Sequence, residues 1–472
     1  MGLLKKIVKN SGVFIFGNIA DTVFNLAISI SLAKYFGQSG FGKLSFLATF
    51  FFLLGSMDNQ WITPILVRDM SRDANNSGRL IGNGLIIRVL ISILAISIFW
   101  ITIWIVKAPV DIVRLAFFAS VGILLASLIS SYGTIFQVNL KMEYFVGFTL
   151  LNRILTLALI YIIVTVKGNI FHFYLLSLIP GIVLLFSVKY YAEKLIRPTF
   201  KIDFKLWRKI FRETWPLALS AFFIFLYHRL DQIMLLYFKG TEAVGLYSAA
   251  VKLTETFSVI PIALMISLLP LMSRYHETSQ KNFDRIYQLS FKYLLTFIIP
   301  VAFGISFFSD RSTSIFYGKD FLSSGPALRI LIWAEVFVFM GVVNNSILIS
   351  ANKQKIDPIF TGASALVNII LNLILIPKYS YIGAAIASLI AYSIGPIMGY
   401  FIRATHFYSR CMLYYSLKPI LASLIMIGLI CYSRFSFLAS ILVAPLVYLL
   451  TMYLIKGIRR DDISLVKSLI SA

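Results

Sequence analysis

The chain has 472 residues, of which 59% are hydrophobic and 13% charged, and its mean hydropathy is +0.86. Because a globular domain carries about 25% charged residues to wet its surface, this composition excludes an ordinary soluble protein. The net charge of +23 would suggest a nucleic-acid partner in a soluble protein. In a membrane protein, basic residues instead collect in cytoplasmic loops and orient the helices. We therefore predict an all-α membrane protein without a nucleic-acid partner.

A helix needs about 20 predominantly apolar residues to cross a bilayer, and about 14 such segments follow one another along the chain. The first six are 11–36, 41–67, 80–106, 111–138, 145–166 and 171–191. After a basic stretch, six more are 215–238, 244–272, 286–309, 326–350, 358–376 and 380–402. The last two are 418–433 and 436–455. The four histidines lack metal-ligand spacing, so no metal or other bound cofactor is predicted.

The loop charges indicate the direction of threading. With the N-terminus inside, the segments on the inner side contain 27 of the 43 basic residues and the outer loops contain 9. Because basic loops stay in the cytoplasm, we predict that both termini are cytoplasmic and that the chain lies in the cell (inner) membrane. The longest inner connection contains the run Phe204–Arg212, which is typical of a basic amphipathic helix on anionic membrane lipids.

A short pattern occurs twice. Residues 37–45 and 240–248 both fit G-x-x-x-[FV]-G-x-[LY]-S, at an offset of 203 residues, and each copy follows the first helix of its half. A repeat after six helices preserves orientation, so we predict two parallel six-helix lobes. The predicted organisation is an N-terminal lobe (1–191), a cytoplasmic linker (192–214), a C-terminal lobe (215–402), and two extra helices with a cytoplasmic tail (403–472).

The first copy of the pattern also resembles a nucleotide-binding loop. Gly37, Gly42 and Lys43 nearly match the P-loop, but Leu44 replaces the hydroxyl residue that binds magnesium. Leu246 replaces the lysine in the second copy, so both copies are interpreted as turns between helices. The outer loops are too short to carry a set of catalytic acids. We therefore predict that the chain is not an enzyme and has no catalytic residues.

Charged residues within spans of the first lobe are candidates for function, because a charge at mid-membrane costs about 2.5–3.5 kcal/mol. Asp21 lies on a polar stripe of the first helix with Asn18 and Asn25, and we interpret it as a cavity-facing, ion-coupling carboxylate. Arg88 and Arg153 lie at similar depth in their helices. Two interpretations stay open for these arginines: their tips reach the inner headgroups, or they line a vestibule and bind substrate.

In the second lobe, Arg229 and Asp231 point about 200° apart at 100° per residue. Lys252 and Glu255 share one helix face. A structural ion pair between Asp231 and Lys252 would lower the cost of both charges. The alternative is that Arg229 and Lys252 bind substrate while Asp231 and Glu255 couple ions. Glu335 has no obvious partner in its own span, which makes it a further candidate for binding an ion.

At this point the pattern resembles the multidrug/oligosaccharidyl-lipid/polysaccharide exporter superfamily, and within it the Wzx-type flippases of polysaccharide repeat units. The resemblance covers nearly the whole chain. The residues that carry it are Leu230–Leu235, Val244–Leu253, Ala351–Gln354 and Ile376–Ala385. These motifs are mostly helix-turn signatures, so they indicate the family rather than the sugar.

The resemblance implies that an undecaprenyl-pyrophosphate-linked oligosaccharide moves from the cytoplasmic to the outer leaflet by alternating access. Such a flippase would serve O-antigen or capsule biosynthesis. H+ or Na+ is the candidate coupling ion. Membrane lipids and the polysaccharide polymerase machinery are candidate partners besides the lipid-linked oligosaccharide.

Two related activities remain as alternatives. A cation-coupled multidrug antiporter would need a net acidic cavity, against which the four basic residues Arg88, Arg153, Arg229 and Lys252 argue. A peptidoglycan-precursor flippase would be expected to carry several basic residues in its first helix. The first helix here has only Lys34, at its outer end.

Overall fold

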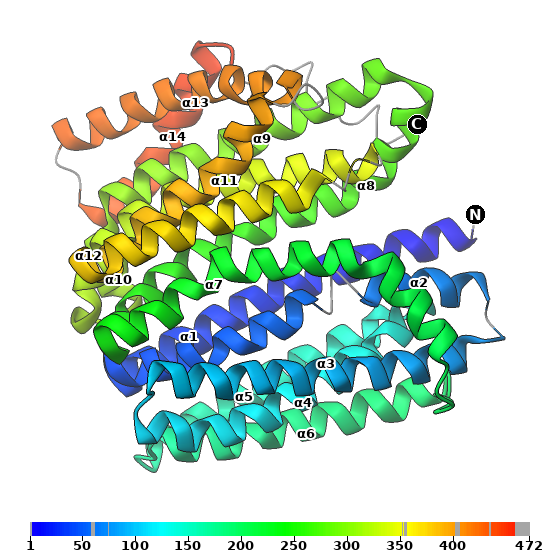
Figure 1. Ribbon diagram of the computed structural model, residues 1–472. Helices are drawn as coiled ribbons and strands as arrows, with labels where there is room; N and C mark the ends of the chain where they lie inside the picture. Colours follow the sequence, from blue (N-terminus) through cyan, green and yellow to red (C-terminus); the bar gives the residue numbers. More distant parts are fainter. Residues whose placement is uncertain are drawn as a thin grey trace. The chain divides into compact units, whose positions relative to one another are not determined.

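The computed structural model describes residues 2–57, 62–73, 75–351, 353, 356–401, 406–433 and 436–457. Its elements, labelled as in Figure 1, are α1 (Gly2–Met57), α2 (Thr63–Arg72), α3 (Ser77–Val106), α4 (Val110–Val138), α5 (Met142–Thr165), α6 (Ile170–Glu193), α7 (Phe204–Glu255), the 3₁₀ turn η2 (Thr256–Ser258), α8 (Val259–Thr278), α9 (Gln280–Phe307), α10 (Ser309–Tyr317), the 3₁₀ turn η3 (Lys319–Ser324), α11 (Gly325–Ser350), α12 (Asp357–Phe401), α13 (His406–Ser433) and α14 (Phe437–Leu454). Every regular element of this described part is helical, which confirms the predicted all-α class.

Ten helical segments of the described chain are long and apolar enough to cross a membrane, which confirms the multi-pass class. Three of them exceed a single crossing, namely Gly12–Leu53, Ala218–Leu269 and Asp357–Phe401. Each contains one residue with non-helical backbone angles: Gly37, Gly240 or Ser380. These breaks lie at or near the boundaries predicted between consecutive spans. The number of crossings, about 14, stays a prediction.

Two segments differ in detail from the predicted spans. The expected single helix 244–272 is divided by η2 into the end of α7 and α8. The expected outer loop between 309 and 326 forms the short helix α10 and the turn η3. A search for apolar runs does not find α10 or η3, because both are short and rich in polar residues. The expected cytoplasmic tail from residue 458 onward lies outside the described residues.

The chain divides into two compact units. Unit 1 comprises Met1–Lys252 and Ala365–Ala384, and unit 2 comprises Leu253–Ser364 and Ala385–Ala472. In unit 1, α1 packs against α5 and α4 packs against both α3 and α6. In unit 2, α9 packs against α11 and α13 around a buried cluster that includes Phe283, Tyr287 and Phe339. The boundaries of the two six-helix lobes stay a prediction.

The two copies of the repeated pattern contact each other within unit 1. Gly37 (φ 67°) and Gly240 (φ 82°) occupy equivalent positions and take the left-handed backbone conformation that favours glycine. A Cβ atom at Gly42 would overlap the carbonyl oxygen of Thr241 and lie 2.9 Å from the nitrogen of Gly245. A Cβ at Gly245 would in turn overlap the carbonyl oxygen of Gln38. The contact is reciprocal, because residues 38 and 42 correspond to 241 and 245 in the repeat.

We call this arrangement the turn contact: residues 37–42 of α1 against residues 240–245 of α7. The hydroxyl groups of Ser39 and Thr241 lie 2.7 Å apart across it. Backbones approach this closely only where both helices present glycine, since any side chain would separate them. The turn contact therefore joins the first helical pair of one predicted lobe to the first helical pair of the other.

The linker also belongs to unit 1 and is tied to the N-terminal end of α3. The backbone N–H of Thr199 donates to the carbonyl of Gly78 at 2.8 Å, and a Cβ at Gly82 would overlap the carbonyl of Thr199. The Asn83 side chain accepts hydrogen bonds from the backbone N–H of Asp203 (3.0 Å) and the indole of Trp207 (2.8 Å). The linker therefore packs against α3.

Ion pairs secure the first turns of α7 to α2. Lys209 contacts Asp69 at 2.8 Å, and Arg68 bridges Asp69 and Glu213. Burial raises the pKa of the Asp69 carboxyl, but hydrogen bonds from Arg68 and Lys209 outweigh it and hold that pKa below its ordinary value. The 204–212 segment is helical as predicted. Its contact with membrane lipids stays a prediction.

We predict that Gly42→Ala or Gly245→Ala weakens the turn contact. The added methyl group must push the opposing backbone away, and overpacking of this kind typically costs about 1–3 kcal/mol. A cysteine pair at Ser39 and Thr241, with Cys411 and Cys431 replaced by serine, reports the contact as the yield of oxidative cross-linking.

Cross-linking should fall in either glycine variant and stay high in Gly147→Ala. Gly147 is a suitable control because a Cβ there meets nothing within 4 Å. Unchanged cross-linking in both variants would show that the backbones are not in contact.

Candidate functional site

Seven of the eight charged residues predicted as candidates lie in four clusters, three in unit 1 and one in unit 2, and Lys252 is the residue at which unit 1 ends in the sequence. The four clusters differ mainly in whether their charged side chains are exposed or buried between helices. That difference matters, because a residue that binds a transported solute or ion must be reachable.

The first cluster joins α1 to α5. The Arg153 guanidinium donates from Nε to Asp21 Oδ1 at 2.6 Å and from Nη2 to Asp21 Oδ2 at 3.3 Å. Asn25 Nδ2 also donates to Asp21 Oδ2 at 2.8 Å. Both charged side chains are about 29% exposed. This is a two-pronged arginine–carboxylate pair, the strongest ion-pair geometry, and it remains accessible.

Local packing explains why α1 and α5 meet here. Gly17 lies one turn before Asp21, and a Cβ there would lie 2.6 Å from the side chain of Val146. At the far end, Tyr35 donates to the carbonyl of Gly168 at 2.8 Å, just beyond α5. The opposite face of α1 is apolar and exposed, with Phe16 at 64% and Val23 at 60%. The polar stripe therefore faces α5.

The second cluster surrounds Arg88, which is 2% exposed in unit 1. Its Nη1 donates to Thr134 of α4 at 3.1 Å and its Nη2 donates to Thr63 of α2 at 2.7 Å. A side chain that reached the headgroups would expose its tip, and this guanidinium is instead enclosed between three helices. Arg88 thus links α2, α3 and α4, and it is less accessible than Arg153.

The third cluster lies between α7 and the second half of α1. The Arg229 guanidinium stacks 4.4 Å from the ring centroid of Phe52. With its amide oriented to satisfy both neighbours, Gln232 accepts from Arg229 Nη1 at 3.2 Å and donates to Thr49 Oγ1 at 3.0 Å. Asp231 points elsewhere, to the hydroxyl of Tyr247. Arg229 and Asp231 therefore face different neighbours, as their spacing predicted.

The fourth cluster lies in unit 2. Glu335 of α11 is 4% exposed and accepts a hydrogen bond from Ser258 of η2. The Glu255 carboxylate is close enough to interact electrostatically with Glu335. Lys252 belongs to unit 1 and comes three residues before Glu255 in the sequence, and both residues are half-buried. Two neighbouring carboxylates repel each other when both are charged, and one proton or monovalent cation between them would relieve the repulsion.

Several partners were not predicted from the sequence. They are Thr63, Thr134, Phe52, Tyr247 and Ser258. Tyr247 lies within the Val244–Leu253 motif, and Ser258 lies one helical turn after Glu255. Their partners, Asp231 and Glu335, are 16 and 77 residues away in the sequence. The threonines around Arg88 come from other helices, and no local pattern marks them. The functional roles of all eight predicted residues stay predictions.

Comparison with known proteins places this arrangement in a family. The chain matches the polysaccharide biosynthesis protein family over residues 7–276 and the MatE family over residues 216–374. It is 24% identical over 223 residues to the probable low-salt glycan biosynthesis flippase Agl15 of Haloferax volcanii, covering 47% of each chain. It is 30% identical over 176 residues to the probable flippase AglR of the same organism, covering 36% of this chain and 37% of that one. The chain thus spans about half, or less, of the length of these curated relatives.

A solved structure extends the comparison over most of the chain. The lipid II flippase MurJ in an inward closed conformation superposes with a TM-score of 0.77 at 21% identity, covering 93% of this chain and 98% of that one. At that identity the likeness shows the fold. The family match covers more than half of the chain, and it agrees with the resemblance predicted from the helix-turn motifs. The chain belongs to the polysaccharide biosynthesis protein family of the multidrug/oligosaccharidyl-lipid/polysaccharide exporter superfamily.

Proposed function

We propose that the protein is a flippase that moves an undecaprenyl-pyrophosphate-linked oligosaccharide from the cytoplasmic to the outer leaflet of the cell (inner) membrane. The family supports the class of substrate, since two relatives bear the names of glycan or probable flippases. Both termini are cytoplasmic in this proposal, as the loop charges predict. The oligosaccharide crosses between the lobes while its lipid tail remains in the bilayer.

The observation that carries the proposal is the accessible pair of Arg153 and Asp21. A guanidinium presents a planar fork that suits one pair of oxygens at a time, whether they belong to a carboxylate or to a phosphate. A diphosphate carries more negative charge than Asp21 and can displace it from Arg153. Arg88 is the weaker candidate for direct contact with the substrate, because its guanidinium is enclosed.

Displacement of Asp21 provides a route to ion coupling. Once the substrate holds Arg153, Asp21 has lost its counter-charge and the amide of Asn25 is its remaining described partner. A carboxylate in that state is stabilised by H+ or Na+. Substrate and ion would then bind together on neighbouring atoms. The carboxylates Glu255 and Glu335 of unit 2 offer a second place for a proton or cation.

Alternating access requires that the turn contact opens at the side predicted to be external. This contact is made by backbone atoms and two hydroxyl groups. The groups that these contacts join are uncharged, so they can separate without breaking an ion pair.

The role of the pair is tested by neutralising it. Arg153→Gln should abolish export of the glycan, because the loss of a charged hydrogen-bonded group costs about 1.5–3 kcal/mol per bond, or at least tenfold in substrate binding. Arg153→Lys should restore export only in part. The measurement is complementation of a flippase-deficient strain, scored against membrane abundance by immunoblot.

The double variant Arg153→Gln/Asp21→Asn separates function from structure. If the pair is only structural, removal of both charges restores abundance and export together. In the proposed mechanism, abundance recovers and export does not. Wild-type export by Arg153→Gln would exclude this residue from substrate binding.

Ion coupling is tested in reconstituted vesicles with an imposed H+ or Na+ gradient. Asp21→Asn and Glu335→Gln each remove a site for a proton or cation, so at least one should make transport independent of the gradient. Glu277→Gln is the control, because this exposed residue lies at the opposite end of α8 from Ser258, the partner of Glu335. Gradient dependence that survives in both site variants would contradict coupling through these residues.

Opening of the turn contact is tested with the Ser39→Cys/Thr241→Cys pair. Oxidation should stop export and a reducing agent should restore it, since the contact must separate in each cycle. Single-cysteine variants should be insensitive to both treatments. Undiminished export by fully cross-linked protein would mean that these turns stay together during transport.

A further inference from the structure

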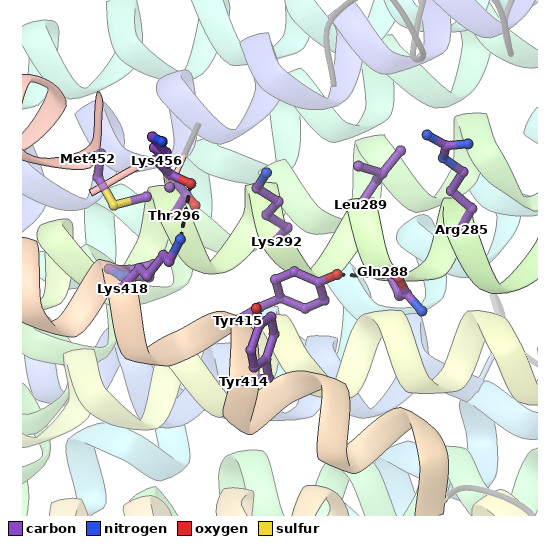
Figure 2. Close-up of a pocket in the computed structure, with 12 residues that line it drawn as sticks. Arg285, Gln288, Leu289, Lys292, Thr296, Tyr414, Tyr415, Lys418, Met452 and Lys456 are labelled. Carbon is purple, nitrogen blue, oxygen red and sulfur yellow. Dashed lines mark hydrogen bonds between the residues drawn. The ribbon is translucent and has the colours of Figure 1, made fainter. Parts of the chain in front are cut away.

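Unit 2 contains a cavity of about 260 Å³ that none of the predicted site residues lines. It lies between α9, α13 and the turn that follows α14, as Figure 2 shows. Four basic residues line it: Arg285 and Lys292 from α9, Lys418 from α13, and Lys456 after α14. The cavity is therefore strongly cationic.

The spacing of residues on α9 explains why two of these basic residues line the same cavity. Arg285 and Lys292 are seven residues apart and lie on one face of α9, two turns from each other. The Lys418 ammonium donates to the backbone carbonyl of Lys456 at 3.1 Å, which ties α13 to the end of α14. The Tyr415 hydroxyl donates to Gln288 at 3.3 Å between α13 and α9. The three helices are thus joined around the cavity by hydrogen bonds whose acceptors, a backbone carbonyl and an amide, are uncharged.

The described lining of the cavity supplies positive charge and no negative charge. None of the twelve described residues around it is acidic. Asp284 precedes Arg285 but accepts a hydrogen bond from Gln280 at 2.8 Å and does not line the cavity. Like charges that converge in this way repel one another, and a bound anion would offset the repulsion.

The surroundings indicate the kind of anion. In the predicted topology, the cavity lies at the cytoplasmic ends of three spans, at the level of the inner headgroups. Apolar side chains are exposed beside it: Leu413 (62%) and Leu417 (64%) on α13, and Leu450 (61%) and Leu454 (69%) on α14. Its volume is below the about 300–1,000 Å³ typical of pockets that enclose a whole small molecule. It suits a headgroup whose hydrocarbon chains stay outside.

We propose that this cavity binds the phosphate group of a lipid in the inner leaflet. Arg285, Lys292 and Lys456 supply charged donors to its oxygens, and basic pockets between membrane helices are known to hold anionic headgroups. An anionic phospholipid and a polyprenyl diphosphate share this chemistry. The site does not depend on the proposed transport function, because it is defined by binding alone.

The test measures lipid binding to the purified full-length protein by native mass spectrometry. The probes are phosphatidylglycerol, undecaprenyl diphosphate, and phosphatidylcholine as a zwitterionic reference. Arg285→Gln/Lys292→Gln should weaken binding of the anionic probes at least tenfold. Arg274→Gln/Lys281→Gln removes the same charge from the same end of unit 2 outside the cavity, and it should change binding less than twofold.

The outcomes separate the two lipid sources. Loss confined to phosphatidylglycerol identifies a phospholipid site, loss confined to undecaprenyl diphosphate identifies the headgroup of a lipid carrier, and loss of both supports phosphate recognition without preference. Equal loss in the control double variant, or no loss in the cavity variant, would overturn the proposal. Melting temperatures without added lipid verify folding, and Lys456→Gln alone provides a milder variant outside the helices. Because no transport is measured, a failed flippase assay leaves this result unaffected.

Discussion

The close approach of two glycine-containing turns is the constraint on which much of the molecule depends. Gly42 and Gly245 bring backbone against backbone, so the first helical pairs of both halves meet without intervening side chains. The linker holds the other end of α7 by different means, through the amide of Asn83 and the ion pairs of Asp69. Within unit 1, α7 is thus held by close backbone packing at residues 240–245 and by hydrogen bonds and ion pairs near its N-terminal end.

This difference in chemistry suits a protein that changes conformation. A contact made by backbone atoms and hydroxyl groups separates at little electrostatic cost, whereas separation of α7 from α2 would break the ion pairs Lys209–Asp69 and Arg68–Glu213. The charged residues within the membrane follow the same division. Arg88 is enclosed and bonded to two threonines, while the Arg153–Asp21 pair remains accessible.

Features set by local sequence were predictable from the chain itself. Apolar runs marked most of the spans, and the glycine pattern marked the turns at Gly37 and Gly240, because both depend on neighbouring residues. The helical turns at 309–324 were not predicted, because they are polar and short. The pairing of Asp21 with Arg153 joins residues 132 positions apart and depends on which helices become neighbours. No periodicity in one helix carries that information, and the same holds for the threonines around Arg88.

The reciprocity of the turn contact also bears on the origin of the fold. Each copy of the repeat presents the same atoms to the other, as the two subunits of a twofold-symmetric dimer do. A half-length ancestor that paired with a second copy of itself in parallel would have made this contact before any gene fusion. Duplication would then have needed only a connecting segment, which the chain now carries at 192–214. In that history, the same glycines would have served the association of two chains before they served packing within one.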